Sequence, residues 1–172
     1  MSEAVKINVG CGLDYRPGFV NVDGNPDLPR VDKVIDFDSD RLSAHFAPDS
    51  VDLVMANDFI EHHVHWHAVK LLKDFFLVLK PGGGLSMQLP DVETIMAATS
   101  IPVETRIFLL YGGQDFYLGE ENPEHRKRFP HYHCHKFGYT RGTMTRELEA
   151  IGFVDVESWG KKTDFVIFAK KP

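Results

Sequence analysis

Two glycines and an aspartate near the N-terminus have the types and spacing needed to hold a nucleoside. Gly10 and Gly12 directly follow an alternating apolar run at residues 5–9, and Asp23 ends a second short apolar run at residues 19–22. Glycine lacks a Cβ, so its backbone can approach a ligand closely and adopt positive φ. A carboxylate at the tip of the next strand can accept hydrogen bonds from both hydroxyls of a ribose. The first hypothesis is therefore a nucleoside-containing ligand.

A dinucleotide fits this stretch less well. Its fingerprint requires a third glycine at position 15, but Tyr15 stands there and Pro17 follows. The interval from Gly10 to Asp23 is also shorter than the roughly 20 residues usual for dinucleotide sites. No clear helix follows Gly12, so no helix N-terminus is expected to receive a pyrophosphate. A ligand with ribose and adenine but no phosphates fits better, and S-adenosylmethionine (SAM) is the common one.

Histidines form two clusters that could take up a proton or bind a metal ion. The first cluster is His62, His63, His65 and His67, and the second is His125, His131, His133 and His135. Imidazole titrates near neutral pH, which suits a general base. Three imidazoles on one face of an extended segment, or His63 and His67 four residues apart on a helix, could also be metal ligands. The order His-x-His-Cys-His matches no standard zinc spacing, so we expect no bound metal and solvated side chains for most of these histidines.

The hydrophobic pattern predicts the strands and helices that would position these residues. Strands are expected at residues 5–9, 19–22, 31–35, 51–56 and 85–89, and helices at 64–79, 92–98, 101–113 and 140–151. Residues 153–159 and 163–169 alternate around a short turn and predict a final hairpin. The glycines at 82–84 should turn the chain, Thr140 or Thr143 should begin the last helix, and Gly152 should end it.

Several of these segments resemble the motifs of class I SAM-dependent methyltransferases, in a short bacterial-type variant. The resemblance begins at Asn8-Val9-Gly10-Cys11-Gly12 with Asn21-Val22-Asp23, and continues through L-K-P-G-G-G-L at 79–85 and A-I-G-F-V-D-V at 150–156. It covers nearly the whole chain. It implies a three-layer α/β, Rossmann-like fold with a mostly parallel sheet, an antiparallel C-terminal hairpin and SAM at the carboxyl ends of the strands.

The resemblance also implies which residues hold the cofactor. They are Asn8, Gly10, Cys11, Gly12 and Asp23 at the first two strands, Asp36, Phe37 and Asp38 around the adenine, and Asn57 at the tip of the fourth strand. Either Asp36 or Asp38 could accept a hydrogen bond from the adenine amine. The same Asp-Ser stretch could instead cap a short helix.

Candidates for the acceptor side lie at the two histidine clusters and beyond the fifth strand. His62 or His63 could face the acceptor, and Asp91 either lies near the ligand cleft or caps the following helix. In the methyltransferases that this chain resembles, a Gly-Gly-Gln segment and a later His-Lys pair follow the fifth strand. Here they are matched by residues 112–114, which end at Gln114, and by His135 with Lys136. We expect His135 to act as the general base, with His63 as the next candidate, and Lys136 to orient an anionic acceptor or lie at the surface.

Length, charge and cysteine content restrict the class of protein. A chain of 172 residues is most simply one domain, and residues 114–138 would form a loop over the acceptor pocket. The net charge of −6 disfavours nonspecific nucleic-acid binding. Two cysteines provide no disulfide framework, and no apolar run is long enough to span a bilayer. We expect a cytoplasmic monomer or homodimer without a nucleic-acid or membrane partner.

The sequence therefore predicts an enzyme that transfers a methyl group from SAM to a small-molecule or sugar-like acceptor and releases S-adenosylhomocysteine. The sugar-like acceptor rests only on the resemblance to short methyltransferases among polysaccharide-modifying proteins. Two alternatives stay open: a SAM-binding protein that does not methylate, and, disfavoured by Tyr15, an NAD-type oxidoreductase.

Overall fold

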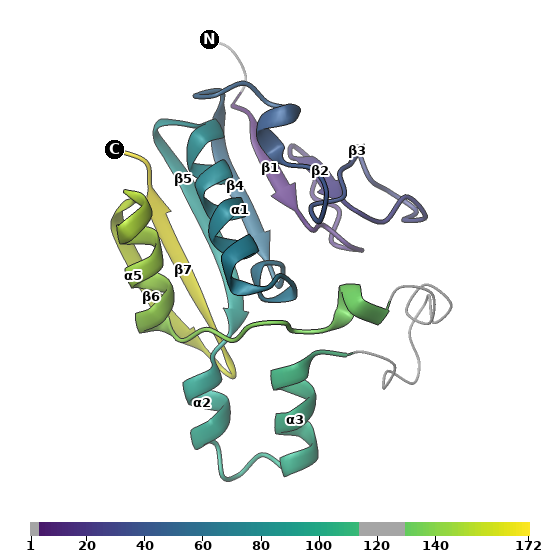
Figure 1. The fold of residues 1–172 in the computed structure, drawn as a ribbon, viewed down its shortest axis with the longest axis vertical. Helices are drawn as coiled ribbons and strands as arrows, with labels where there is room; N and C mark the ends of the chain where they lie inside the picture. The colour runs from purple at the N-terminus through teal and green to yellow at the C-terminus, as the bar shows by residue number, and fades with distance from the viewer. Residues whose placement is uncertain (1–3, 114–129) are drawn as a thin grey trace.

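A seven-stranded mixed sheet organises the part of the chain that the structure, a computed structural model, describes (residues 4–113 and 130–172). The strand order is β3-β2-β1-β4-β5-β7-β6, and only β7 runs antiparallel to its two neighbours (Figure 1). The strands are β1 (Lys6–Val9), β2 (Val20–Asp23), β3 (Lys33–Val34), β4 (Val51–Asn57), β5 (Leu79–Pro90), β6 (Val154–Lys161) and β7 (Asp164–Lys170). The predicted mostly parallel sheet with an antiparallel C-terminal hairpin is confirmed.

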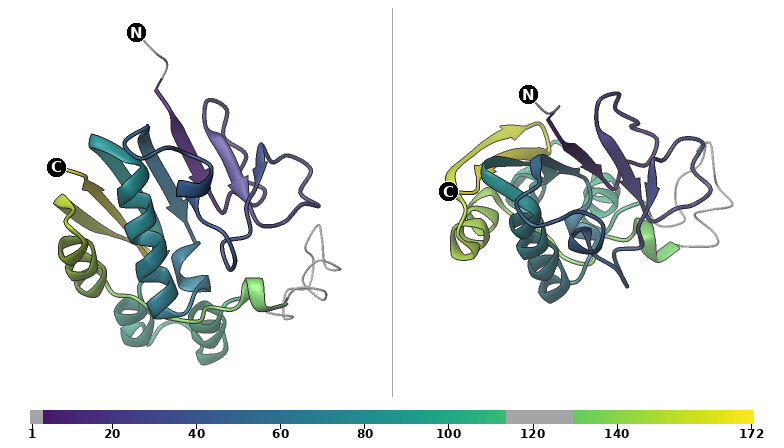
Figure 2. Two further views of the ribbon diagram at one scale, coloured as in Figure 1. Left: turned by 45° about the horizontal axis from the view of Figure 1, so that its top comes forward. Right: turned by 90° about the horizontal axis from the view of Figure 1, so that it is seen from above.

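Helices flank this sheet. They are α1 (His65–Val78), α2 (Val92–Ala97), α3 (Val103–Tyr111) and α5 (Arg141–Ile151), with 3₁₀ turns η1 (Leu42–Ala44), η2 (Ile60–His62) and η3 (Pro130–His133). Figure 2 shows α1 and α5 on the same face of the sheet, while α2 and α3 lie beyond the ends of the strands. None of the helices among the described residues is long and apolar enough to cross a membrane.

The main core lies between the sheet and α1. Ala68, Leu72 and Phe75 on α1 are fully buried, as the helical spacing of these residues predicts. They belong to one cluster with alternate residues of the strands, among them Ile7, Val9, Val54, Ala56, Leu85, Met87, Phe165 and Ile167. Because side chains alternate across a strand, these positions share the face that packs on the helix.

The final helix has the ends that its sequence predicts. The side chain of Thr140 accepts a hydrogen bond from the amide of Thr143, and the Thr143 side chain accepts one from the Thr140 amide. Gly152 adopts φ 115° and its amide donates to the Leu148 carbonyl at 3.2 Å. Thr140 is therefore the N-cap and Gly152 the C-terminal glycine.

The glycine-rich turn before the fifth strand differs from the prediction. Residues 79–83 are already part of β5, because Leu79 pairs with Val51 and Gly83 accepts a hydrogen bond from the Lys171 amide at 3.0 Å. A register shift between Val51 and Leu53 accommodates the turn within the paired strands. Gly83 has no room for a side chain, since a Cβ there would lie 2.9 Å from the Lys80 carbonyl oxygen.

Short connections at the carboxyl edge of the sheet bring distant segments together. The β1–β2 and β2–β3 connections contain no helix, so both strand tips stay close to the sheet edge. The segment after η3 runs across this edge beside η2 (Figure 1), where the amide of Lys136 donates to the Glu61 carbonyl at 2.7 Å. The carboxyl ends of parallel strands are where α/β proteins bind ligands.

Candidate functional site

A pocket of about 700 Å³ opens at the carboxyl edge of the sheet. Its walls come from the turn after β1, the tip of β2, the segments after β3 and β4, and residues 132–136. Nine predicted site residues line it: Gly10, Gly12, Asp23, Asp36, Phe37, Asp38, His62, His63 and Lys136. A volume of this size suits a ligand of nucleoside dimensions.

The glycine turn forms the floor of this pocket. Gly10 has φ 63°, and a Cβ on it would lie 2.5 Å from Cδ2 of Phe59. Gly12 has φ 49°, and its amide donates a 2.8 Å hydrogen bond to Oδ2 of Asp23. Both glycines are thus required by the backbone conformation, and Gly10 also by its close packing against Phe59.

Asn8 and Cys11 lie behind the turn and do not line the pocket. Asn8 is 3% exposed. Its side-chain amide nitrogen donates to the Asp14 carbonyl at 2.8 Å and to Oδ1 of Asn21 at 3.1 Å. Burial, aided by the Asp23 carboxylate, raises the pKa of the Cys11 thiol to about 12. These two residues therefore support the turn from within the protein.

The segment after β3 supplies an apolar wall with carboxylates on either side. Phe37 is buried and meets Phe59 edge-on, with ring centroids 5.1 Å apart. The Asp36 carboxylate accepts hydrogen bonds from the Asp38 amide and the Ser39 hydroxyl, both at 3.1 Å. Asp36 thus stabilises a local turn while it lines the pocket. The alternative of an Asp-Ser cap on a short helix is wrong, because the N-cap of η1 is Arg41 and no side chain caps that helix.

At the tip of β4, Asp58 rather than Asn57 lines the pocket. Asp58 has φ 47°, a left-handed conformation that turns the chain away from the strand direction at this point. Burial and the nearby Asp164 carboxylate raise the pKa of Asp58 to about 6. This side chain presents a partly desolvated carboxyl group to the pocket.

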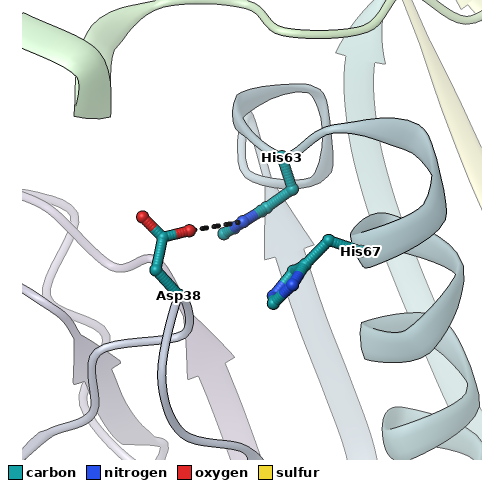
Figure 3. Close-up of side chains that lie close together, drawn as sticks. All are labelled: Asp38, His63 and His67. Atoms are coloured by element: carbon teal, nitrogen blue, oxygen red, sulfur yellow. Dashed lines mark ion pairs between the residues drawn. The ribbon is translucent and has the colours of Figure 1, made fainter.

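His63 lies between the pocket and α1, next to Asp38 and His67 (Figure 3). Its Nδ1 is 3.4 Å from an oxygen of Asp38, and its ring stacks on His67 with centroids 5.3 Å apart. The Nε2 of His67 donates to the Phe37 carbonyl at 2.7 Å. Burial lowers the pKa of His63 to about 4, although the Asp38 carboxylate opposes this shift.

His135 does not line the pocket but contacts a residue that does. Its ring lies edge-on to His62, with centroids 4.9 Å apart, and its Nδ1 donates to the Leu109 carbonyl at 3.1 Å. Burial lowers the pKa of His135.

The remaining candidates for contact with the acceptor differ in whether they line the pocket. Lys136 lines the pocket, whereas Asp91 does not. Asp91 is 2% exposed, and its carboxylate accepts from the Thr94 hydroxyl at 2.9 Å and lies 3.8 Å from Nε of Arg141. It stands at the N-cap of α2 without a side-chain hydrogen bond to the helix amides. Gln114 and most of the segment predicted to cover the pocket lie outside the described residues.

Sequence reasoning missed part of the lining. The missed residues are Leu13, Gly24, Asn25, Asp27, Leu28, Pro29, Asp58, Phe59, Tyr132 and His133. Those at 24–29 occupy a turn-rich linker without periodicity, so no pattern in the sequence marked them. Asp58 and Phe59 directly follow the predicted strand at 51–56 and Asn57. Their place just after a strand end is the one feature of the sequence that could have marked them as pocket residues.

Comparison with known proteins finds solved structures of similar fold, but no match among family models or curated proteins. A SAM-dependent methyltransferase from Archaeoglobus fulgidus is similar in structure, with TM-score 0.64 and 15% identity over 98% of this chain and 86% of that one. One from Mesorhizobium loti has TM-score 0.62 and 14% identity over 99% and 92%.

A longer protein has the same arrangement. Phosphoethanolamine N-methyltransferase 2 from Haemonchus contortus, determined with SAM, matches with TM-score 0.60 and 14% identity, and this chain spans 50% of its length. The fold of the present chain is that of the class I SAM-dependent methyltransferases.

Proposed function

We propose that this protein is a SAM-dependent methyltransferase that acts on a small acceptor. The observation that carries the proposal is the pocket at the carboxyl edge of the sheet. In its wall, the Gly12 amide donates a 2.8 Å hydrogen bond to the Asp23 carboxylate, which joins the glycine turn to the tip of β2. Asp23 is held at the tip of β2, the position at which α/β folds bind a ribose. The solved structures of similar fold are SAM-dependent methyltransferases, one of them determined with SAM, and they support SAM as the cofactor.

The lining residues suggest how SAM would lie. The adenine would pack on Phe37 between the carboxylates of Asp36 and Asp38, and the ribose hydroxyls would donate to Asp23. The methionine part would then extend over Gly10 and Gly12 toward the far wall of the pocket. The sulfonium would face the wall formed by Asp58, His62 and His63.

The chemistry is an in-line displacement at carbon. A lone pair of the acceptor attacks the methyl group, the carbon–sulfur bond breaks, and its electron pair neutralises the sulfonium to give S-adenosylhomocysteine. Alignment supplies much of the rate, and an oxygen or nitrogen acceptor must also lose a proton. His63 is our first choice to take it, because it lines the pocket and its Nδ1 faces Asp38 at 3.4 Å. His135, the base that the sequence favoured, touches the pocket only through His62.

The acceptor that we propose is a small molecule with a sugar-like hydroxyl group, in keeping with the resemblance of the sequence. Lys136 at the pocket wall would orient an anionic group of that acceptor. Cys11 and Cys134 form no disulfide, which suits a protein of the reducing cytoplasm, and we propose that it acts as a monomer or homodimer.

A methyl-transfer assay tests this function. The protein is incubated with SAM labelled in its methyl group and a panel of acceptors that present sugar hydroxyls, phenols, amines or carboxylates. Label should pass to one acceptor class, and His63→Ala should abolish transfer while it leaves cofactor affinity unchanged. Tight cofactor binding with no transfer to any class would favour the non-catalytic alternative.

A further inference from the structure

Three side chains with metal-ligating atoms converge beside the pocket. One ligand atom each of Glu61, His62 and His135 lies within 4.8 Å of one atom of both others. His62 also lines the pocket, so this cluster borders the space where the acceptor would enter. The sequence gives no sign of the cluster, because 73 positions separate the adjacent Glu61 and His62 from His135.

Glu61 has the burial of a metal ligand. It is 2% exposed, and neither of its carboxylate oxygens has a hydrogen-bond partner among the described residues. An ionised carboxylate in such surroundings is strongly unfavourable unless a cation or a hydrogen-bond donor compensates it.

Both imidazoles are oriented as metal ligands usually are. Nδ1 of His62 donates to the Cys134 carbonyl at 3.1 Å, and Nδ1 of His135 donates to the Leu109 carbonyl at the same distance. These bonds fix the tautomer and leave the lone pair on Nε2 of each ring. A backbone carbonyl that accepts the second ring N–H is the common outer support of a metal-bound histidine.

Backbone hydrogen bonds hold the three residues together. The amides of Lys136 and Phe137 donate to the Glu61 carbonyl at 2.7 and 3.3 Å. The amide of His135 donates to the Tyr111 carbonyl at 3.0 Å, which ties the same segment to the end of α3. The backbone that carries the three ligand residues is therefore held in place by hydrogen bonds.

We propose that Glu61, His62 and His135 bind one divalent transition-metal ion at the edge of the pocket. Two imidazoles and one carboxylate are a donor set that suits Zn²⁺, Fe²⁺ or Mn²⁺ and leaves coordination positions open. This proposal replaces the expectation of no metal, which considered the histidines by their spacing and did not include Glu61.

The role of the ion rests on the proposed function. An ion with open positions would bind an acceptor oxygen and lower the pKa of its hydroxyl group. The hydroxyl proton would pass to the imidazole of His63, the oxygen lone pair would attack the methyl carbon, and the electron pair of the broken carbon–sulfur bond would stay on sulfur. The acceptor class that follows is an alcohol or phenol rather than an amine.

A second cluster, Asp38, His63 and His67 (Figure 3), is the weaker candidate. The Asp38 side chain is 43% exposed, so water already solvates its carboxylate. The adjacent His63 already faces that carboxylate at 3.4 Å, which accounts for this pair without an ion. This cluster therefore serves as the competing site in the test.

The test measures metal binding by the full chain without SAM or acceptor. Protein stripped with a chelator is titrated with Zn²⁺ by calorimetry and with Co²⁺ by visible absorption, which reports imidazole coordination. We expect one ion per chain and a loss of affinity greater than about 100-fold in Glu61→Gln and in His135→Ala. Asp38→Asn and His65→Ala should bind as the parent chain does.

No binding below about 0.1 mM, or binding lost in Asp38→Asn and kept in Glu61→Gln, would overturn the proposal. Should His135→Ala fail to fold, Glu61→Gln suffices, because a neutral side chain of the same shape removes only the buried charge. Zn²⁺ should raise the melting temperature of the parent chain and not that of Glu61→Gln. Since no cofactor is present, failure here is distinct from failure of the SAM proposal.

Discussion

The backbone amide of Gly12 donates to the carboxylate of Asp23 at 2.8 Å, which joins the turn after β1 to the tip of β2. The second oxygen of Asp23 accepts from the Asn25 amide at 2.8 Å. Both oxygens are thus fixed in direction and retain further lone pairs for a ligand. The carboxylate is oriented in advance by the backbone on both sides of it.

Removing this carboxylate should abolish cofactor affinity. Asp23→Ala loses the charged acceptor of both ribose hydroxyls, and hydrogen bonds to charged groups contribute about 1.5–3 kcal/mol each. We expect affinity for S-adenosylhomocysteine to fall by more than about 100-fold in a calorimetric titration. Asp14→Ala is the control, because Asp14 pairs with Arg16 and does not line the pocket. Unchanged affinity in Asp23→Ala would contradict the ribose assignment.

Gly10 should tolerate no side chain. In Gly10→Ala the new Cβ meets the Phe59 ring at 2.5 Å, and φ 63° is unfavourable for alanine. We expect a loss of about 1–3 kcal/mol in the free energy of unfolding, measured by urea denaturation. Gly160→Ala, where a Cβ meets nothing within 4 Å, should be close to neutral. Equal stabilities for the two variants would show that the turn is not constrained as the structure describes.

The two cysteines should differ in reactivity with an alkylating reagent. Cys11 is 3% exposed, and its pKa is raised to about 12 by burial and the carboxylates near it. A raised thiol pKa favours the neutral form, so Cys11 stays a poorly reactive thiol from neutral pH up to about pH 10. Iodoacetamide at pH 8 followed by peptide mass mapping should therefore modify Cys134 first. Equal labelling of both thiols in the folded protein would contradict the buried position of Cys11.

The cap of α5 provides a test of the fold away from the pocket. Thr140→Ala removes the hydroxyl that accepts from the Thr143 amide at 3.2 Å, and loss of such a cap usually costs about 1 kcal/mol. The melting temperature should fall by a few degrees while cofactor affinity stays the same. Thr99→Ala, at an exposed position between α2 and α3, is the matched control. A larger effect on cofactor binding than on stability would be inconsistent with a purely structural role.

Local pattern was sufficient for most elements of the fold. The stripe of Ala68, Leu72 and Phe75 predicted α1, and Thr140 with Gly152 marked the ends of α5, because these signals lie within one helix. The start of β5 was placed too late, since residues 79–83 join the sheet through bonds to β4 and to Lys171, a partner 88 positions beyond Gly83.

The site likewise contains residues that local sequence patterns predict and residues that they do not. Gly10, Gly12 and Asp23 could be predicted, because a turn and a strand tip have local signatures. The choice of Asp58 over Asn57 depends on a positive φ that the sequence does not encode in any simple pattern. Glu61 lies beside a segment far along the chain, where the amides of Lys136 and Phe137 donate to its backbone carbonyl, so no local spacing could reveal its surroundings.

Titration of the purified protein with SAM, S-adenosylhomocysteine and NAD by calorimetry tests the central claim most directly. The account predicts micromolar affinity for both adenosyl ligands, one site per chain, and no detectable binding of NAD. Binding of NAD, or no binding of any of the three, would contradict it, because the pocket formed by the glycine turn and Asp23 would then hold a different ligand.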